Sequence, residues 1–142
     1  MHSEVERFAF EVCRASFLSL WSYHGPLGKG GKEPCDILVV CDPHVVIISV
    51  KNVRYKDTGR PDIDRMRWQR EAIDESAEQI YGAERWTKNA ARVVRGDGEE
   101  GLPLPPVAGR RVHRVAVAYG SQGQVPLKFG DFGKGFVHVL DG

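Results

Sequence analysis

Two short apolar runs folded around Asp42-Pro43 constrain this chain more than any other feature. The runs extend from Asp36 to Cys41 and from Val45 to Val50, within the segment DILVVCDPHVVIISVKN. Their length and their content of Val and Ile are typical of strands buried on both faces of a sheet. Asp-Pro between them favours a tight turn. The segment therefore predicts a β-hairpin at the centre of a sheet.

The open end of this hairpin carries polar residues that a buried strand does not need. If the turn spans residues 41–44, the register sets Asp36 opposite Ser49. Side chains alternate between the two faces of a strand, so Lys51 lies on the face of Ser49. A carboxylate, a hydroxyl and an ammonium are costly at the end of an apolar hairpin unless they satisfy one another or bind a ligand. Either a cross-strand ion pair or a ligand site follows.

Helices are predicted on both sides of the hairpin in the sequence. Ser3 followed by Glu6 is a capping pattern, and apolar residues recur at helical spacing as far as about Leu20. Residues 25–31 are too rich in glycine to continue that helix and predict a loop. Residues 62–94 predict one long helix or two broken ones, with Met66, Ile73 and Ile80 on a narrow apolar face.

The remaining segments complete an α/β pattern. Residues 96–106 predict a surface loop, whereas residues 112–119 and 136–140 predict strands. The resulting order of helix, strand pair, helix, strand and strand predicts a mixed β-sheet flanked by helices. A chain of 142 residues is expected to form a single domain, residues 1–142. It ends directly after the last strand, where a covering helix normally follows, as the N-terminal part of a longer protein would.

Composition narrows the setting and the partners. The formal charge is +1, so any attraction to a polyanion must come from a local patch. No apolar stretch reaches the roughly twenty residues that cross a bilayer, and the N-terminus lacks the layout of a signal peptide. Three cysteines, an odd number, do not form the framework of a small secreted scaffold. We expect a cytoplasmic protein with no membrane partner.

Asp36, a gap of twelve residues and then Ser49-Val50-Lys51 resemble the motif of the PD-(D/E)XK phosphodiesterase superfamily, which includes many restriction enzymes, junction resolvases and repair nucleases. The resemblance implies a restriction-endonuclease-like core of α-β-β-β-α-β order. It implies a nuclease that uses Mg²⁺ or Mn²⁺ to hydrolyse nucleic-acid phosphodiester bonds, in restriction, repair or defence. Asp36 would bind the metal, the Val50 carbonyl would face it, and Lys51 would orient or activate water.

The resemblance also implies partners. DNA is favoured over RNA as the substrate. Nucleases that cut both strands often pair as symmetric dimers, so a homodimer is one expectation.

Ser49 departs from the superfamily pattern, which usually has Asp or Glu at this position. Mg²⁺ prefers anionic oxygen ligands, so the implied site lacks one charge. Glu11 is the preferred replacement, because it lies near the middle of the first helix and the superfamily often supplies a glutamate from that helix. Acids of the long helix are alternatives: Glu71, Glu75 and Glu78. If none compensates, the chain is a catalytically inactive module that binds nucleic acid or a protein partner.

A basic segment follows the hairpin. From Lys51 to Arg70 there are seven Lys and Arg residues and three Asp residues, which gives a local charge of +4. Such a segment can follow a phosphate backbone, with Tyr55 or Trp68 stacking on a splayed base. A solvated helix face is the other interpretation. The predicted nucleic-acid contacts are Arg54, Lys56, Arg60, Arg65 and Arg67.

Overall fold

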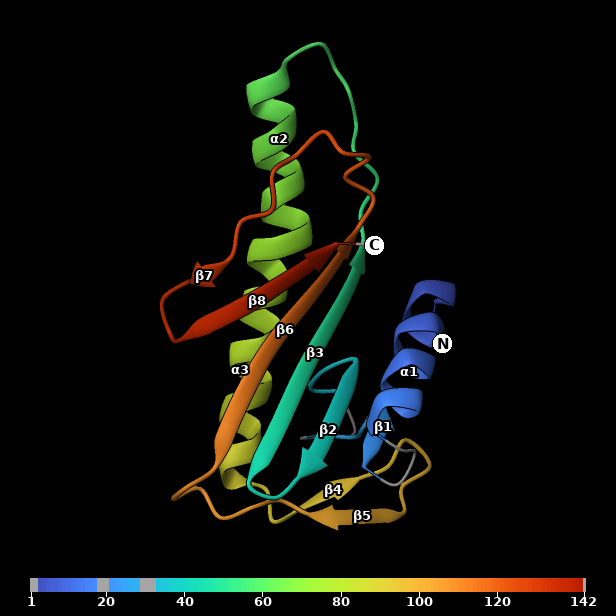
Figure 1. Cartoon of the computed structure of the whole chain (residues 1–142), viewed down its shortest axis with the longest axis vertical. Coiled ribbons are helices and arrows are strands. Elements are labelled where there is room, and N and C mark those ends of the chain that lie inside the picture. Colours follow the sequence, from blue (N-terminus) through green and yellow to red (C-terminus); the bar gives the residue numbers. More distant parts are fainter. Residues whose placement is uncertain (1–2, 18–20, 29–32, 142) are drawn as a thin grey trace.

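A computed structural model of the chain describes residues 3–17, 21–28 and 33–141 (Figure 1). The fold is α/β, with a six-stranded mixed sheet and helices against it. The elements in chain order are α1 (Glu4–Phe17), β1 (Ser22–His24), β2 (Ile37–Cys41), β3 (His44–Asn52), α2 (Pro61–Gln69), a π-helical turn (Arg70–Asp74), α3 (Glu75–Asn89), β4 (Arg92–Val94), β5 (Glu100–Pro103), β6 (Arg111–Tyr119), β7 (Gly130–Asp131) and β8 (Phe136–Asp141).

The predicted hairpin lies in the middle of the sheet with the predicted register. The strand order is β1-β2-β3-β6-β8-β7. Strands β2 and β3 are antiparallel, with Val40 opposite Val45, and both are buried along most of their length. Strands β3, β6 and β8 are parallel, so the chain returns from the end of β3 to the start of β6 through the helices. This crossover places α2 and α3 on one face (Figure 1).

Each face of the sheet has its own apolar cluster. Strand residues such as Leu38 and Ile47 pack with Ile73 and Ile80 of the long helical segment. On the other face, Ala9 and Cys13 of α1 pack against β2 and β3. As predicted, Ser3 and Glu6 cap α1 reciprocally: the Glu6 N–H donates to Ser3 Oγ over 3.1 Å, and the Ser3 N–H to Glu6 Oε2 over 3.3 Å.

The long helical segment differs from its predicted apolar face at one residue. Ile73 and Ile80 are fully buried, but Met66 is 69% exposed and Trp68 is buried in its place. The cause is the π-helical turn, in which the Glu75 N–H donates to the Arg70 carbonyl five residues earlier. One extra residue in a turn rotates the helix before it by about 100° relative to the helix after it. The spacing of seven from Met66 to Ile73 therefore no longer keeps both on one face.

Short strands account for the other differences. The helix ends at Asn89, because Ala90 adopts an extended backbone, and residues 92–94 form β4. Part of the predicted loop at 96–106 is β5, which pairs with β4. Strands β1 and β7 were not predicted. The glycine-rich loop holds a bridge between Leu27 and Val94, while residues 29–32 and the predicted helical residues 18–20 lie outside the described ranges.

Candidate active site

Asp36 lies immediately before β2, where the strand ladder with β3 ends. Its Oδ2 accepts a hydrogen bond of 2.7 Å from the Val50 N–H. A continued ladder would have supplied a backbone carbonyl to this N–H. The carboxylate therefore replaces a backbone acceptor and is fixed against the end of β3.

The Val50 backbone opens toward the same edge as Asp36. In an extended strand, the N–H and C=O of one residue point to the same side. Since the Val50 N–H points to Asp36, its carbonyl oxygen also faces the space beyond the first residue of β2. Two oxygen types that bind Mg²⁺, a carboxylate and a backbone carbonyl, are thus directed to one place.

Other acids lie close enough to act on Asp36. Partial burial raises the pKa of the Asp36 carboxyl above its ordinary value, and the Val50 N–H opposes this rise. Glu6 of α1 and Glu33 raise the same pKa further, whereas Lys51 lowers it. The region around Asp36 therefore has excess negative charge, which a cation would offset.

Lys51 is half-buried and follows Val50 on β3. Among the ion pairs of the described residues, none joins Lys51 to Asp36, so the cross-strand ion pair considered from the sequence is not formed there. The odd-numbered residues of β3 that enter the cluster against α3 are Val45 and Ile47, and alternation places Ser49 and Lys51 on that face. Leu38 and Val40 of β2 belong to the same cluster. Asp36 precedes β2, and its position is fixed by the bond from the Val50 N–H.

Ser49 is fully buried against α3 and does not face solvent. Its hydroxyl lies 3.3 Å from Ser76 Oγ and 3.2 Å from Gln79 Oε1. Ser76 in turn donates to the Ala72 carbonyl, within the helix. This cluster of Ser49, Ser76 and Gln79 satisfies its own hydrogen bonds, so a neutral hydroxyl suits position 49 without a metal.

The candidate acids for the missing charge lie in different places. Glu11 is exposed and forms an ion pair of 2.6 Å with Arg14 on α1. It is Glu6, one and a half turns earlier, that acts on Asp36. In the long helical segment, Glu75 and Glu78 are exposed, and Glu71 is half-buried with Arg70 3.9 Å away.

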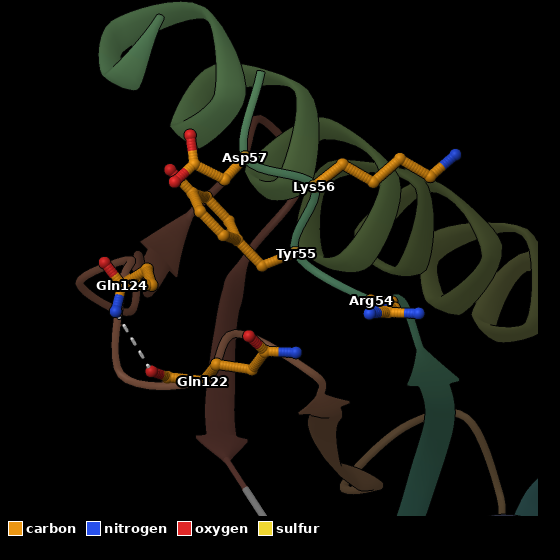
Figure 2. A pocket seen from close by; sticks show the side chains of 6 residues that line it. All are labelled: Arg54, Tyr55, Lys56, Asp57, Gln122 and Gln124. Atoms are coloured by element: carbon orange, nitrogen blue, oxygen red, sulfur yellow. Dashed lines mark hydrogen bonds between the residues drawn. The ribbon is translucent and has the colours of Figure 1, made fainter. Parts of the chain in front are cut away.

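A polar cleft of about 510 Å³ begins three residues beyond Lys51 (Figure 2). One wall is the connection from β3 to α2, and the other is the turn after β6. We call it the glutamine cleft, and its lining residues are Arg54, Tyr55, Lys56, Asp57, Gln122 and Gln124. The cleft lies outside the carboxyl ends of the parallel strands β3 and β6, where open α/β sheets commonly bind ligands.

The predicted nucleic-acid contacts divide into two groups. Arg54, Lys56 and Arg60 are exposed. Arg65 and Arg67 serve the structure as well: Arg65 Nε donates to the Gln124 carbonyl over 3.3 Å, and Arg67 pairs with buried Asp64 at 2.9 Å. The basic segment is therefore partly a structural connection and partly an open surface.

The two aromatic residues predicted to stack on a base are both buried. Trp68 is 2% exposed, and its Nε1–H donates to the Val53 carbonyl over 2.6 Å. Tyr55 belongs to the same apolar cluster. Stacking by Trp68 is incompatible with this position, because the side chain is enclosed.

Two residues that the fold brings to the site had no predicted role there. Gln79 contacts Ser49, but the helical phase that places it there depends on the π-helical turn. Glu6 was assigned only to the capping of α1. Its place near Asp36 results from the packing of α1 on the sheet, for which the sequence has no local signal.

The side chains near Asp36 can be compared with what a divalent ion requires. Among residues 3–17, 21–28 and 33–141, no group of three or more His, Cys, Asp or Glu side chains is gathered closely enough to hold a metal. Mg²⁺, however, usually keeps several waters and binds through one or two carboxylates together with substrate phosphates. Among the described residues, the Asp36 carboxylate bonds the Val50 N–H, and the Val50 carbonyl lies on the same side of β3.

We found no protein-family model, curated protein or solved structure that matches this chain. None of the helices in the described part of the chain is long and apolar enough to cross a membrane.

Proposed function

We propose that the protein is a metal-dependent nuclease that hydrolyses nucleic-acid phosphodiester bonds. The observation that carries the proposal is the arrangement of Asp36 against the end of β3, with the Val50 backbone open to the same edge and Lys51 one residue further. The order of α1, β1, β2, β3, α2–α3 and β6 supports it, because it is compatible with the α-β-β-β-α-β order of a restriction-endonuclease-like core once the separate strands β4 and β5 are left aside.

Each residue has a definite task in this proposal. Asp36 and the Val50 carbonyl would hold a divalent ion, and Glu6 would supply the charge that Ser49 does not. Mg²⁺ or Mn²⁺ bound there would offset phosphate charge and make a bound water more acidic. The Lys51 ammonium donates hydrogen bonds to a phosphate oxygen or to the attacking water and holds it in line.

The choice of Glu6 rests on electrostatics and on the position of α1. A carboxylate that raises the pKa of Asp36 is a neighbour that a shared cation would stabilise. Glu6 also accepts the capping bond from the Ser3 N–H, and Glu11 pairs with Arg14 in solvent. Replacement of Glu6 should therefore cost activity, and replacement of Glu11 should not.

The test is cleavage of plasmid, linear and single-stranded DNA, and of RNA, in Mg²⁺ or Mn²⁺ and in EDTA. We expect wild-type cleavage to require the metal and to fall by about a hundredfold or more in Asp36→Ala, Lys51→Ala and Glu6→Gln. Glu11→Gln is the matched control and should cleave like the wild type. Cleavage that survives Asp36→Ala and Lys51→Ala together would refute this site.

A catalytically inactive nucleic-acid-binding module is the second candidate. The observation that favours it is the closed hydrogen bonding of Ser49 with Ser76 and Gln79, which holds position 49 away from any ion. On this alternative, wild-type protein and Asp36→Ala bind nucleic acid equally and neither cleaves it. A filter-binding assay run beside the cleavage assay separates the two candidates.

A further inference from the structure

The glutamine cleft is built from two segments that are far apart in sequence and joined by backbone. The Val53 N–H donates to the Tyr119 carbonyl over 3.0 Å, and the Tyr55 N–H to the Gly120 carbonyl over 2.9 Å. These two bonds extend the pairing of β3 with β6 into the base of the cleft. The two walls therefore have a fixed spacing at their origin.

Contacts from α2 hold the walls further out. Trp68 and Arg67 donate to the Val53 and Lys56 carbonyls of the first wall. On the second wall, Arg65 donates to the Gln124 carbonyl, and Gln69 Nε2 to the Pro126 carbonyl over 3.3 Å. A cleft whose walls are fixed before a ligand arrives loses less entropy on binding.

Gln122 has an unfavourable backbone conformation within this cleft. Its φ is +55°, and among the described residues it is the non-glycine at positive φ. This region is populated mainly by Gly, Asn and Asp. The turn itself is closed by the Gln124 N–H, which donates to the Ser121 carbonyl over 3.0 Å. The hydrogen bond that closes this turn is made by backbone atoms, so the Gln122 side chain is left to line the cleft.

The side chains around the cleft have a complementary chemistry. Figure 2 shows Gln122 and Arg54 coming from the two walls of the cleft, and Lys56 extending away from both glutamines. Gln124 Nε2 lies 3.5 Å from the Gln122 carbonyl. Arg54 is suited to a phosphate, and a carboxamide presents a donor and an acceptor that match the edge of a base.

The distance to the candidate active site fits one nucleic-acid strand. Arg54 is three residues beyond Lys51, which an extended chain spans in at most about 10 Å. A strand with one phosphate near Lys51 can therefore place a neighbouring nucleotide in the cleft. The volume of about 510 Å³ lies within the usual range for small-ligand sites, roughly 300–1,000 Å³.

We propose that the glutamine cleft binds one nucleotide of a single-stranded nucleic acid, with Arg54 on its phosphate and the Gln122 carboxamide on the edge of its base. We propose an unpaired base, because the Watson–Crick edge of a base is free to bond an amide only when the base has no pairing partner. The inference deepens the proposed nuclease function and rests on it for the path of the strand. Binding in the cleft, however, does not need catalysis.

The experiment measures fluorescence anisotropy of labelled single-stranded homopolymers of A, C, T and U, with duplex DNA as comparison, in EDTA. The protein is the full chain, as wild type and as Asp36→Ala. We expect tighter binding of single strands than of duplex, unequal affinities among the bases, and about tenfold weaker binding in Arg54→Ala. Arg85→Ala removes an exposed cation from α3 and should bind like the wild type.

Gln122→Gly separates ligand binding from structure. Glycine relieves the positive φ, so thermal stability should stay equal or rise. Discrimination among the bases should disappear, because the carboxamide is gone. DNA and RNA series compared in the same assay identify which sugar the strand carries.

Two outcomes would overturn the inference. One is wild-type protein that does not bind single strands. The other is Gln122→Gly and Arg54→Ala proteins that bind every homopolymer as the wild type does. If base discrimination is lost in Gln122→Gly while no variant ever cleaves, the cleft stands and the nuclease proposal fails. If cleavage depends on Asp36 while neither cleavage nor binding depends on Arg54 or Gln122, the nuclease proposal stands and the inference about the cleft fails.

Discussion

Buried polar groups and polar groups at the sheet edge follow different rules in this protein. Ser49, Ser76 and Asp64 are each at most 1% exposed, and each has hydrogen-bond partners within the fold. At the edge, Asp36 lies among other acids, and Gln122 has an unfavourable backbone. The contribution of the buried residues to folding stability is enough to account for them, whereas it does not account for the two residues at the edge. A substitution should therefore reduce either stability or ligand binding, according to the set it belongs to.

The largest loss of stability is expected where an aromatic residue assigned to binding is enclosed. Trp68→Ala should lower the free energy of unfolding by about 3–5 kcal/mol, because it leaves a cavity and an unpaired Val53 carbonyl. Met66→Ala, on the same helix and 69% exposed, is the control and should change it by no more than about 0.5 kcal/mol. Urea denaturation measures both. Equal effects would mean that the helical phase set by the π-helical turn is wrong.

The junction beneath the glutamine cleft should be nearly as sensitive. Gly120 has φ +101°, and a Cβ there would overlap the Val53 carbonyl oxygen. Gly120→Ala should cost about 3 kcal/mol, from overpacking and backbone strain together. Gly123 has φ +70° with open space around it, so Gly123→Ala should cost only about 1 kcal/mol. Thermal or urea unfolding distinguishes them, and a harmless Gly120→Ala would contradict the close approach of β3 and β6.

Ser49 provides a smaller test of the division between the two sets. Ser49→Ala removes a buried hydroxyl that contacts Ser76 and Gln79, and should cost about 1 kcal/mol. Metal-dependent cleavage should persist, since the hydroxyl is sealed away from the edge. Parallel unfolding and cleavage assays make the measurement. If Ser49→Ala keeps its stability and loses cleavage, position 49 belongs to the active site after all.

The smallest expected effect is a change in pH dependence. Hydrogen bonds from Thr58, chiefly, and the charge of Arg67 hold the pKa of the Asp64 carboxyl below its ordinary value of 3.8. A lowered pKa stabilises the fold above the ordinary value, and that stability is lost as the pH falls through the lowered one. Melting temperatures from pH 7 downward should fall less steeply in Asp64→Asn than in the wild type. An unchanged slope would mean that this carboxyl does not titrate differently on folding.

The hairpin could be predicted because its signals are local. Alternation of side chains and a turn at Asp42-Pro43 fix the register, which in turn fixes the face of Ser49 and brings Asp36 to the end of β3. The capping of α1 is likewise encoded by two residues, Ser3 and Glu6. These features depend on residues at most about a dozen positions apart.

The remaining features depend on packing between distant segments. The π-helical turn shifts the phase of Met66 against Ile73, and no residue type in Arg70–Asp74 announces it. Strands as short as β1 and β7 have too few residues for a periodic pattern. Gln122 and Arg54 line the cleft from segments nearly seventy residues apart. The predicted acid was Glu11, and which acid of α1 acts on Asp36 depends on how α1 packs on the sheet.

The lengths of the two outermost strands bear on how copies of the chain could associate. β1 has three residues, all paired with β2, whereas β7 has two and covers only Phe136 and Val137 of β8. On that side, residues 138–141 of β8 have no neighbouring strand in the described part of the chain. A strand of a second copy would find its unpaired backbone groups at this short segment of β8.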